Sequence, residues 1–230
     1  MKTAKILCFG DSNTWGTKPD GGRYEDHERW SFLLGAYLNM AALQERGQTA
    51  ANDSIEISSD STHESDTFFL VIEAGQPNRT LVKNAPFDGD KSGVVYLKPL
   101  LEVHQPDVLI ILLGTNDLKA KFDLSADEIA SAAFELISQT QALMPSIKVI
   151  LLAPPMIKEV APYLSIYAGG ENKSQKLALE YEVQAKRLGC YFSDANKMIT
   201  SSDLDGIHWD MSEHERLAVG LAARLKNWLD

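Results

Sequence analysis

KILCFGDSNTWG, residues 5–16, joins an apolar run to a cluster of small polar residues. The run at residues 6–9 carries no charge and ends at Gly10, which is typical of a short strand buried on both faces of a sheet. Residues 11–13, Asp-Ser-Asn, follow the glycine directly. The segment therefore predicts a buried strand with a hydroxyl side chain just beyond its carboxyl end.

Four more apolar runs have this character, and helical patterns separate them. In the helical segments apolar side chains recur every three or four residues, as at Trp30–Ala41, Ile129–Thr140 and Leu217–Trp228. Strands that alternate with helices form βαβ units, which bury a parallel sheet between two helical layers. We therefore predict a three-layer α/β fold with five parallel strands, at Lys5–Phe9, Phe68–Glu73, Val108–Leu113, Lys148–Ala153 and Cys190–Ser193.

Helix starts and irregular segments are also marked in the sequence. Ser125–Glu128 and Ser212–Glu215 each have the spacing of a capping box, so we expect a helix to open at each serine. Residues 46–66 are polar and acidic and predict a surface insertion. Residues 154–170 combine three prolines with apolar side chains, which need cover from a ligand pocket or another subunit. No linker divides the chain, so we expect a single domain over residues 1–230.

The charge and the cysteine content argue against several classes of protein. The chain has 22 Lys and Arg against 32 Asp and Glu, so neither nucleic acid nor an anionic membrane surface is an expected partner. Cys8 and Cys190 are too few for a disulfide framework and lie in apolar stretches, which favours reduced, buried thiols. No run is long enough for a signal-peptide core or a membrane span. These features predict a cytoplasmic protein.

Candidate site residues follow the predicted strands at their carboxyl ends, where open α/β sheets bind ligands. Ser12 follows the first strand, Gly75 the second and Asn116 the third, while Asp205 and His208 follow the fifth. Acyl transfer needs such a set, because a serine nucleophile requires an imidazole base and a carboxylate that orients the imidazole. Asp205 and His208 are three residues apart, so a single turn can bring the carboxylate to the ring nitrogen that faces away from Ser12.

Four short motifs give the chain a resemblance to a known family. They are Gly10-Asp11-Ser12-Asn13, the glycine at position 75, Gly114-Thr115-Asn116-Asp117 and Asp205-Gly206-Ile207-His208. In this order they resemble the conserved blocks of the SGNH hydrolases, also called GDSL esterases and lipases, and they span nearly the whole chain. The strings GDSNTWG, LLGTND and DGIH look most similar to a subgroup of arylesterases that also transfer acyl groups to alcohols.

The resemblance implies a flavodoxin-like fold and a serine esterase that hydrolyses short acetyl or aryl esters through an acyl-enzyme. It makes Ser12 the nucleophile, His208 the base and Asp205 its partner. It also implies an oxyanion hole formed by the N–H groups of Ser12 and Gly75 and by the Asn116 amide. We expect no metal and no cofactor. The expected partners are a small-molecule acyl ester with water or an alcohol, and a homo-oligomer is compatible with the apolar loop.

Two neighbours of the nucleophile are candidates for substrate binding. Trp15 follows Ser12 closely and is a candidate for the lining of the acyl pocket. Asn13 stands where the motif that names the family has leucine, so we expect it to tune the pocket. Carbohydrate O-acetylesterases and thioesterases use the same apparatus, so the leaving group stays open.

Other interpretations of the same residues are simpler. Ser12 can be a helix N-cap and Asn116 a turn residue. A receiver-like domain would use Asp11 and Asp117 to bind a divalent metal and accept a phosphoryl group, but it leaves the fifth-strand motif unexplained. A non-catalytic binding module on this fold is a further alternative. The remaining histidines lack partners in the pattern and are interpreted as ordinary polar or surface residues: His27, His63, His104 and His214.

Overall fold

The computed structural model describes residues 2–40, 67–82 and 92–229, so the insertion expected at residues 46–66 lies outside the described part of the chain. A five-stranded parallel sheet with the order β2-β1-β3-β4-β5 forms its centre. This is the flavodoxin-like strand order. The strands are β1 (Lys2–Gly10), β2 (Thr67–Gly75), β3 (Val108–Leu112), β4 (Lys148–Ala153) and β5 (Tyr191–Asp194).

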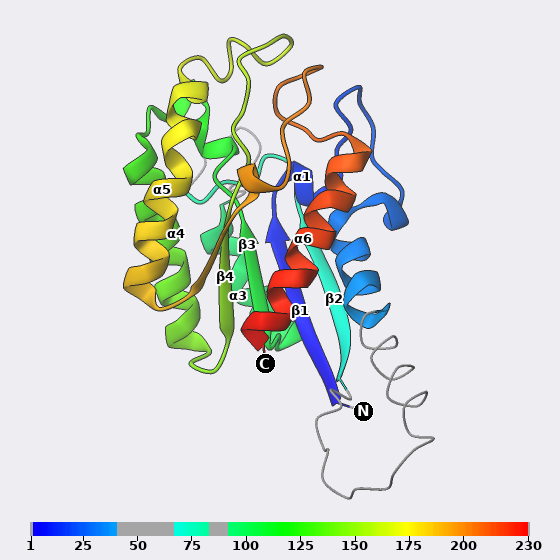
Figure 1. Ribbon diagram of the computed structural model, residues 1–230. Helices are drawn as coiled ribbons and strands as arrows, with labels where there is room; N and C mark the ends of the chain where they lie inside the picture. Colours follow the sequence, from blue (N-terminus) through cyan, green and yellow to red (C-terminus); the bar gives the residue numbers. More distant parts are fainter. Residues whose placement is uncertain (1, 41–66, 83–91, 230) are drawn as a thin grey trace, which may run out of the picture.

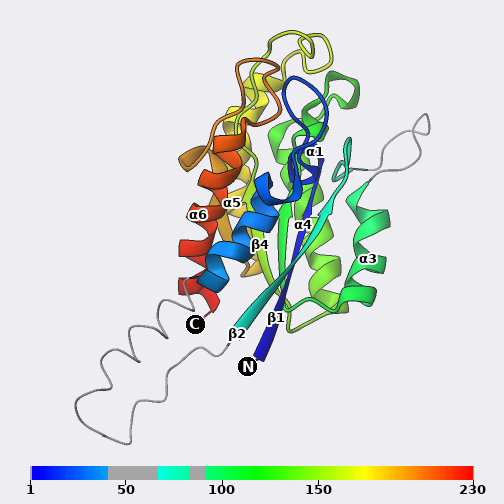
Figure 2. The same ribbon diagram turned by 90° about the vertical axis from the view of Figure 1, so that its right-hand side faces the viewer.

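Helices cover both faces of the sheet, as predicted (Figure 1). One layer consists of α3 (Gly93–His104), α4 (Ala126–Leu143) and α5 (Gly170–Leu188). The other consists of the helical residues 30–40 and of α6 (Met211–Leu229), and Figure 2 shows the two layers on opposite sides of the sheet. No helix of the described ranges is both long and apolar enough to cross a membrane.

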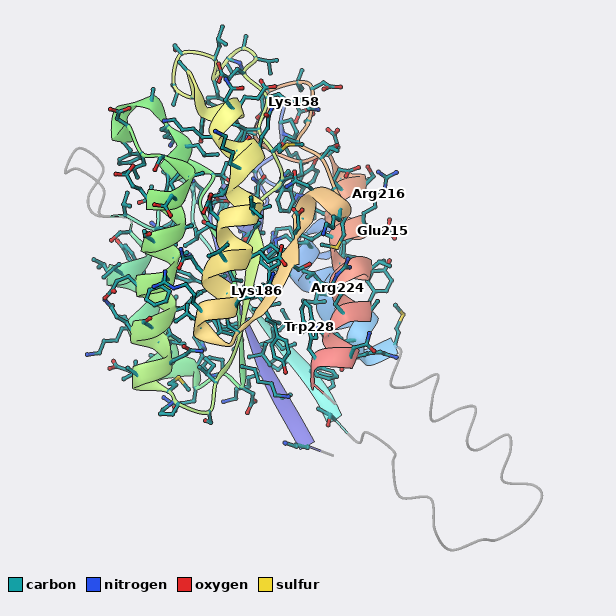
Figure 3. The ribbon with its side chains drawn as sticks, turned by 60° about the vertical axis from the view of Figure 1, so that its left-hand side comes forward. Lys158, Lys186, Glu215, Arg216, Arg224 and Trp228 are labelled. Atoms are coloured by element: carbon teal, nitrogen blue, oxygen red, sulfur yellow. The ribbon has the colours of Figure 1, made fainter. Side chains whose placement is uncertain are left out.

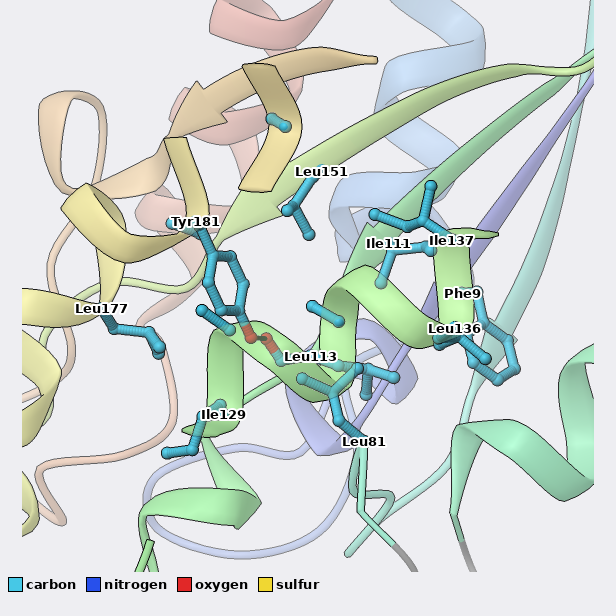
Figure 4. Close-up of a cluster of buried hydrophobic side chains, with 14 of the residues drawn as sticks. Phe9, Leu81, Ile111, Leu113, Ile129, Leu136, Ile137, Leu151, Leu177 and Tyr181 are labelled. Carbon is cyan, nitrogen blue, oxygen red and sulfur yellow. Dashed lines mark hydrogen bonds between the residues drawn. The ribbon is translucent and has the colours of Figure 1, made fainter. Parts of the chain in front are cut away.

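The alternation of side chains along the strands divides the core in two. Leu7 and Phe9 of β1 face α3, α4 and α5, where Phe9 belongs to a cluster with Leu136 and Tyr181 (Figure 4). Ile6 and Cys8 face the opposite layer. Because β1 is covered on both faces, all four of these side chains are fully buried. Removing such a residue from water stabilises the fold by roughly 1.5–3 kcal/mol for a large aliphatic or aromatic side chain.

The five predicted strands are all present, but the two at the edges of the sheet, β2 and β5, are less buried than expected. Phe68 and Leu70 were expected to be buried on a covered strand but are 41% and 43% exposed. The physical reason is position, because within the described sheet β2 pairs only with β1 and β5 pairs only with β4. Of the two cysteines, Cys8 is buried, Cys190 is half-buried, and both are free thiols.

Of the two helix starts that the capping boxes predicted, one is confirmed and the other is wrong. α4 opens with the predicted capping box, in which the Ser125 Oγ accepts from the Glu128 N–H and the Glu128 carboxylate accepts from the Ser125 N–H. α6, by contrast, begins at Met211, so the prediction that Ser212 precedes it is wrong. α3 was not predicted at all.

The end of β1 requires a residue without a side chain. A Cβ built on Gly10 would lie 2.0 Å from the Thr14 Oγ1 and 2.9 Å from the Leu112 carbonyl oxygen. Both contacts are far shorter than van der Waals separation, because the chain turns back over the strand immediately after this residue. Glycine is therefore needed here for close approach of two chain segments.

Gly10→Ala should lower the free energy of unfolding by about 1–3 kcal/mol, the usual cost of inserting an extra methyl group into packed surroundings. Urea unfolding of the wild type and the variant measures this difference. Gly35→Ala is the matched control, because its Cβ would meet only the tip of Val71 at 3.2 Å. An equal effect of the two substitutions would show that close packing at Gly10 is not the reason for the glycine.

Candidate active site

The chain reverses direction just beyond β1. α1 (Ser12–Trp15) is a single helical turn, and the Asp11 carboxylate caps it by accepting from the Asn13 N–H at 3.0 Å. Ser12 is the first residue of this turn and is 8% exposed. A backbone N–H at a helix N-terminus has no acceptor within the helix. The end of β1 thus presents both the hydroxyl and the N–H of Ser12.

Ser12, His208 and Asp205 form a continuous hydrogen-bonded chain. The His208 Nε2 lies 3.1 Å from the Ser12 Oγ, and the His208 Nδ1 lies 2.5 Å from the Asp205 Oδ2. A carboxylate oxygen only accepts, so the proton between His208 and Asp205 belongs to Nδ1. Nε2 is then the lone-pair nitrogen. The arrangement lets the imidazole accept the proton of the Ser12 hydroxyl.

The Asp205 carboxylate also organises the loop that carries His208. Its Oδ1 accepts from the N–H groups of Ile207 and His208, both at 2.9 Å. Burial alone would raise the pKa of Asp205, but the hydrogen bonds from the His208 ring and from these two N–H groups outweigh it, and the pKa is lowered. Asp205 therefore stays ionised near neutral pH and holds the imidazole in one orientation.

The segment 155–160 supports this loop from outside. The Lys158 ammonium donates to the Ser201 carbonyl and to the Asp203 carboxylate, and the Lys158 N–H donates to the Gly206 carbonyl. Gly206 has φ +76°, and a Cβ there would lie 2.0 Å from the Lys158 carbonyl oxygen. Lys158 lies toward the end of the molecule where the strands terminate (Figure 3). The loop between β5 and α6 is consequently held by the loop after β4.

Asn116 follows β3 and faces the same space as Ser12. Its Nδ2 donates to the Arg79 carbonyl at 3.1 Å, and its Oδ1 accepts from the Tyr167 hydroxyl at 3.2 Å. An amide nitrogen carries two protons, so one N–H of Asn116 remains beyond the bond to Arg79. Asn116 is 4% exposed and forms part of the cavity wall beside Ser12.

Gly75 is not among the described residues that line the cavity beside Ser12, whereas Asn78 is. Gly75 pairs with Gly10 in the sheet, and a Cβ there would lie 2.2 Å from the Trp15 nitrogen. Close packing of α1 on β2 thus accounts for this glycine. Asn78 lines the cavity, has φ +65° and sits in a turn closed by the Arg79 N–H and the Gln76 carbonyl. A proline followed by an asparagine with positive φ is typical of a type II turn.

A cavity of about 190 Å³ lies at this end of the sheet. Ser12, Asn116 and His208 form its floor, and Tyr163, Ile166 and Tyr167 come from the loop at residues 154–169. The apolar residues of this loop were expected to need cover, and several of them find it at the cavity. The other described residues that line it are Thr17, Pro77, Asn78, Lys119 and Ile207.

The sequence profile of one family matches the chain from residue 6 to residue 221, and that family is described as GDSL-like lipase/acylhydrolase. The match covers the serine at the end of β1, the asparagine after β3 and the Asp-His pair before α6. The chain belongs to this family. It is a carboxylic ester hydrolase, as the sequence predicted.

Solved structures of other hydrolases are similar to this one over nearly their whole length. An aryl esterase from M. smegmatis is 32% identical with a TM-score of 0.78, over 97% of this chain and 99% of that one. Est24, a carbohydrate acetylesterase from Sinorhizobium meliloti, is 28% identical with a TM-score of 0.82, over 98% and 99%. No curated protein matches the chain. These likenesses confirm the predicted fold of the hydrolase.

Asn13 and Trp15 were expected to contact substrate, but the described residues that line the cavity include neither. The Asn13 side chain is buried and donates to the Ile207 carbonyl at 3.2 Å, so it joins α1 to the loop of His208. The Trp15 ring is covered by the Arg23 guanidinium, whose carbon lies 4.5 Å from the ring centroid. In this hydrolase Asn13 therefore supports Ile207 of the cavity wall, and Trp15 packs against Arg23.

The carboxylates of Asp11 and Asp117 are held by backbone N–H groups. Asp117 accepts from Leu81 and Val82 at 2.9–3.0 Å, which fixes the segment after β2. Within the described residues, no three His, Cys, Asp or Glu side chains form a group that could hold a metal ion. The bonds that Asp11 and Asp117 accept from backbone N–H groups favour a structural role for both carboxylates.

Among the histidines that the structure describes, His214 has surroundings that contradict the sequence interpretation. It was expected to be an ordinary polar or surface residue, but its side chain is fully buried between Tyr24 and Trp209. Burial lowers the pKa of His214 to about 3, so it stays neutral. Its Nδ1 accepts from the Trp30 N–H at 3.3 Å. The role of His214 is thus structural, and the spacing of residues in the sequence does not predict it.

Asp117→Asn should change how stability depends on pH. Burial raises the pKa of Asp117 to about 6 from 3.8. Between about pH 4 and pH 6 the folded state then binds more protons than the unfolded state, so this group makes the free energy of unfolding fall as the pH rises. The variant lacks this titration, and its free energy of unfolding should fall less over the same interval.

Urea unfolding at several pH values between 4 and 7 compares the two proteins. Asp20→Asn, at an exposed aspartate, is the control and should reproduce the wild-type slope. An identical slope for Asp117→Asn and the wild type would contradict the raised pKa.

Proposed function

We propose that Ser12 is the nucleophile of this esterase and that it forms an acyl-enzyme with short-chain esters. The observation that carries the proposal is the hydrogen-bonded chain from Ser12 through His208 to Asp205 at the floor of a cavity. The Ser12 Oγ attacks the ester carbonyl carbon while the His208 Nε2 takes its proton. The imidazolium then returns that proton to the leaving alkoxide, and water activated by His208 releases the acid.

We propose three donors for the negative charge that develops on the carbonyl oxygen. They are the N–H of Ser12, the N–H of Asn78 and the second N–H of the Asn116 amide. In the described part of the chain, the Asn78 N–H donates to no other residue. We therefore assign to Asn78 the role that the family resemblance implied for Gly75. Each such donor typically contributes about 3–4 kcal/mol to the stability of the transition state.

The size and the lining of the cavity favour small acyl groups. At about 190 Å³ it is smaller than the roughly 300–1,000 Å³ of sites for drug-sized ligands. Tyr163 and Ile166 narrow it from above. We propose acetyl esters of phenols or of small polar alcohols as substrates, and transfer of the acetyl group to an added alcohol is a second expected outcome. Aryl acetates, acetylated sugars and acetyl thioesters assayed with and without an alcohol distinguish these cases.

Ser12→Ala should lose nearly all turnover while remaining folded, because removal of a nucleophile costs several orders of magnitude in kcat. Hydrolysis of 4-nitrophenyl acetate measures the loss, and the melting temperature shows that the variant is folded. A phosphonate that reacts with activated serines should label the wild type at residue 12. Full activity in Ser12→Ala, or loss of wild-type activity in EDTA, would contradict the proposal.

Asn116→Ala should lower kcat by about a hundred- to a thousandfold with a smaller change in KM, because its amide meets charge that exists only in the transition state. Asn116→Asp should be at least as harmful, since a carboxylate offers no donor. Both variants should still react slowly with the phosphonate, because the triad is intact.

Asn39→Ala is the matched control for the loss of structural hydrogen bonds. The Asn39 amide joins the helical residues 30–40 to the backbone of Phe69 through bonds of 2.9 and 3.0 Å, away from the cavity. This variant should have a lower melting temperature and an unchanged kcat. If Asn116→Asp keeps the wild-type kcat, Asn116 is a turn former and the oxyanion assignment is wrong.

A cytoplasmic location and a homo-oligomer stay predictions from the sequence. Size-exclusion chromatography with light scattering tests the second of these. The apolar loop at residues 154–169 supports an assembly, since Leu164 and Ile166 are about half exposed.

A further inference from the structure

Tyr167 joins the loop above the cavity to the residue after β3. It comes from the segment between β4 and α5, its side chain is 3% exposed, and its hydroxyl donates to the Asn116 Oδ1 at 3.2 Å. The same segment is tied to the chain that follows Asn116, because the Ala120 N–H donates to the Ile166 carbonyl at 2.8 Å. Tyr167 is therefore fixed relative to Asn116 by two contacts.

The partners of the Asn116 amide determine which way it points. The Arg79 carbonyl can only accept, so the group that faces it at 3.1 Å must be the NH₂ of the amide. The oxygen then faces Tyr167, whose hydroxyl must donate. A rotation of the amide by 180° would place two oxygens against each other at Arg79 and would turn Oδ1 away from the tyrosine. Both contacts oppose this rotation, so the bond from Tyr167 adds to that of Arg79 in holding the direction of the unused N–H.

We propose that Tyr167 is a positioning residue, which holds the Asn116 amide so that its free N–H stays directed at the developing oxyanion. The inference rests on the proposed function, because it assumes that Asn116 donates to the oxyanion. A phenol suits this task, since burial raises the pKa of Tyr167 well above its ordinary value and the hydroxyl remains a donor throughout the working range. Phenylalanine would fill the same volume without holding the amide.

The first test is Tyr167→Phe. Loss of one neutral hydrogen bond that restrains the amide should lower kcat by about tenfold while KM changes by less than about twofold. Tyr191→Phe is the matched control. Its hydroxyl likewise donates to an amide oxygen, here the backbone carbonyl of Trp228 at 2.8 Å. Figure 3 shows Trp228 far from the end of the molecule where Lys158 lies. This variant should keep the wild-type kcat.

The second test is the double variant Asn116→Ala with Tyr167→Phe. A residue that acts only through Asn116 has nothing to position once the amide is gone, so the double variant should have the same kcat as Asn116→Ala alone. Phosphonate labelling of Ser12 in every variant, together with melting temperatures, shows that the triad and the fold are intact. A variant that has only lost stability should keep the wild-type kcat when its rate is divided by the concentration of protein that the phosphonate can label.

Three outcomes overturn the inference. A wild-type kcat for Tyr167→Phe beside a much lower kcat for Asn116→Ala refutes the positioning role but leaves the proposed function standing. Multiplied losses in the double variant mean that Tyr167 acts on substrate independently of Asn116. A wild-type kcat for Asn116→Ala refutes the oxyanion assignment, and the inference with it.

Discussion

The carboxyl end of β1 is the constraint on which the site depends. β1 pairs with β2 on one side and with β3 on the other, and Gly10 lies in register with Gly75 and with Leu112. Because the side chains at residues 6–9 are fully buried, this strand cannot slide without exposing both halves of the core. The position of Ser12 is therefore fixed by the sheet. The turn after β2 and the turn after β3 start from the two strand ends beside it, which brings their donors within reach.

Three carboxylates lie at the carboxyl edge of the sheet, those of Asp205, Asp11 and Asp117, and each has different hydrogen-bond donors around it. Asp205 accepts from an imidazole and two N–H groups, and its pKa is lowered despite burial. For Asp11 and Asp117 burial outweighs the backbone N–H groups that they accept from, and the pKa of each is raised to about 6. Only the first of the three is bonded to an imidazole. Sequence position alone makes them equivalent strand-end acids, and it is the number and charge of the donors that distinguish them.

The strands, and the residues of the hydrogen-bonded set Ser12, His208 and Asp205, could be predicted because each lies in a short local pattern. A fully apolar run such as residues 108–112 has few alternatives to a buried strand, and Asp205 and His208 stand on one turn. α3 was missed because it contains Pro99 and begins with a glycine and two valines, all of low helix propensity. Its helical state depends on packing against the sheet and α4. The role proposed for Asn78 likewise depends on tertiary structure, because it uses the backbone N–H of a turn beside the cavity and does not use the side chain.

The loop at residues 154–169 lacks a periodic pattern because its side chains serve two places at once. Ile157 is buried in the core beside α5, whereas Tyr163 and Ile166 line the cavity and Tyr167 does both. A segment with such divided contacts cannot repeat every two or every 3.6 residues. The same division joins the cavity to the core, because Tyr167 both lines the cavity and packs in the core. One piece of chain thus lines the cavity and contacts the Asn116 amide, so a change of sequence there should alter selectivity and turnover together.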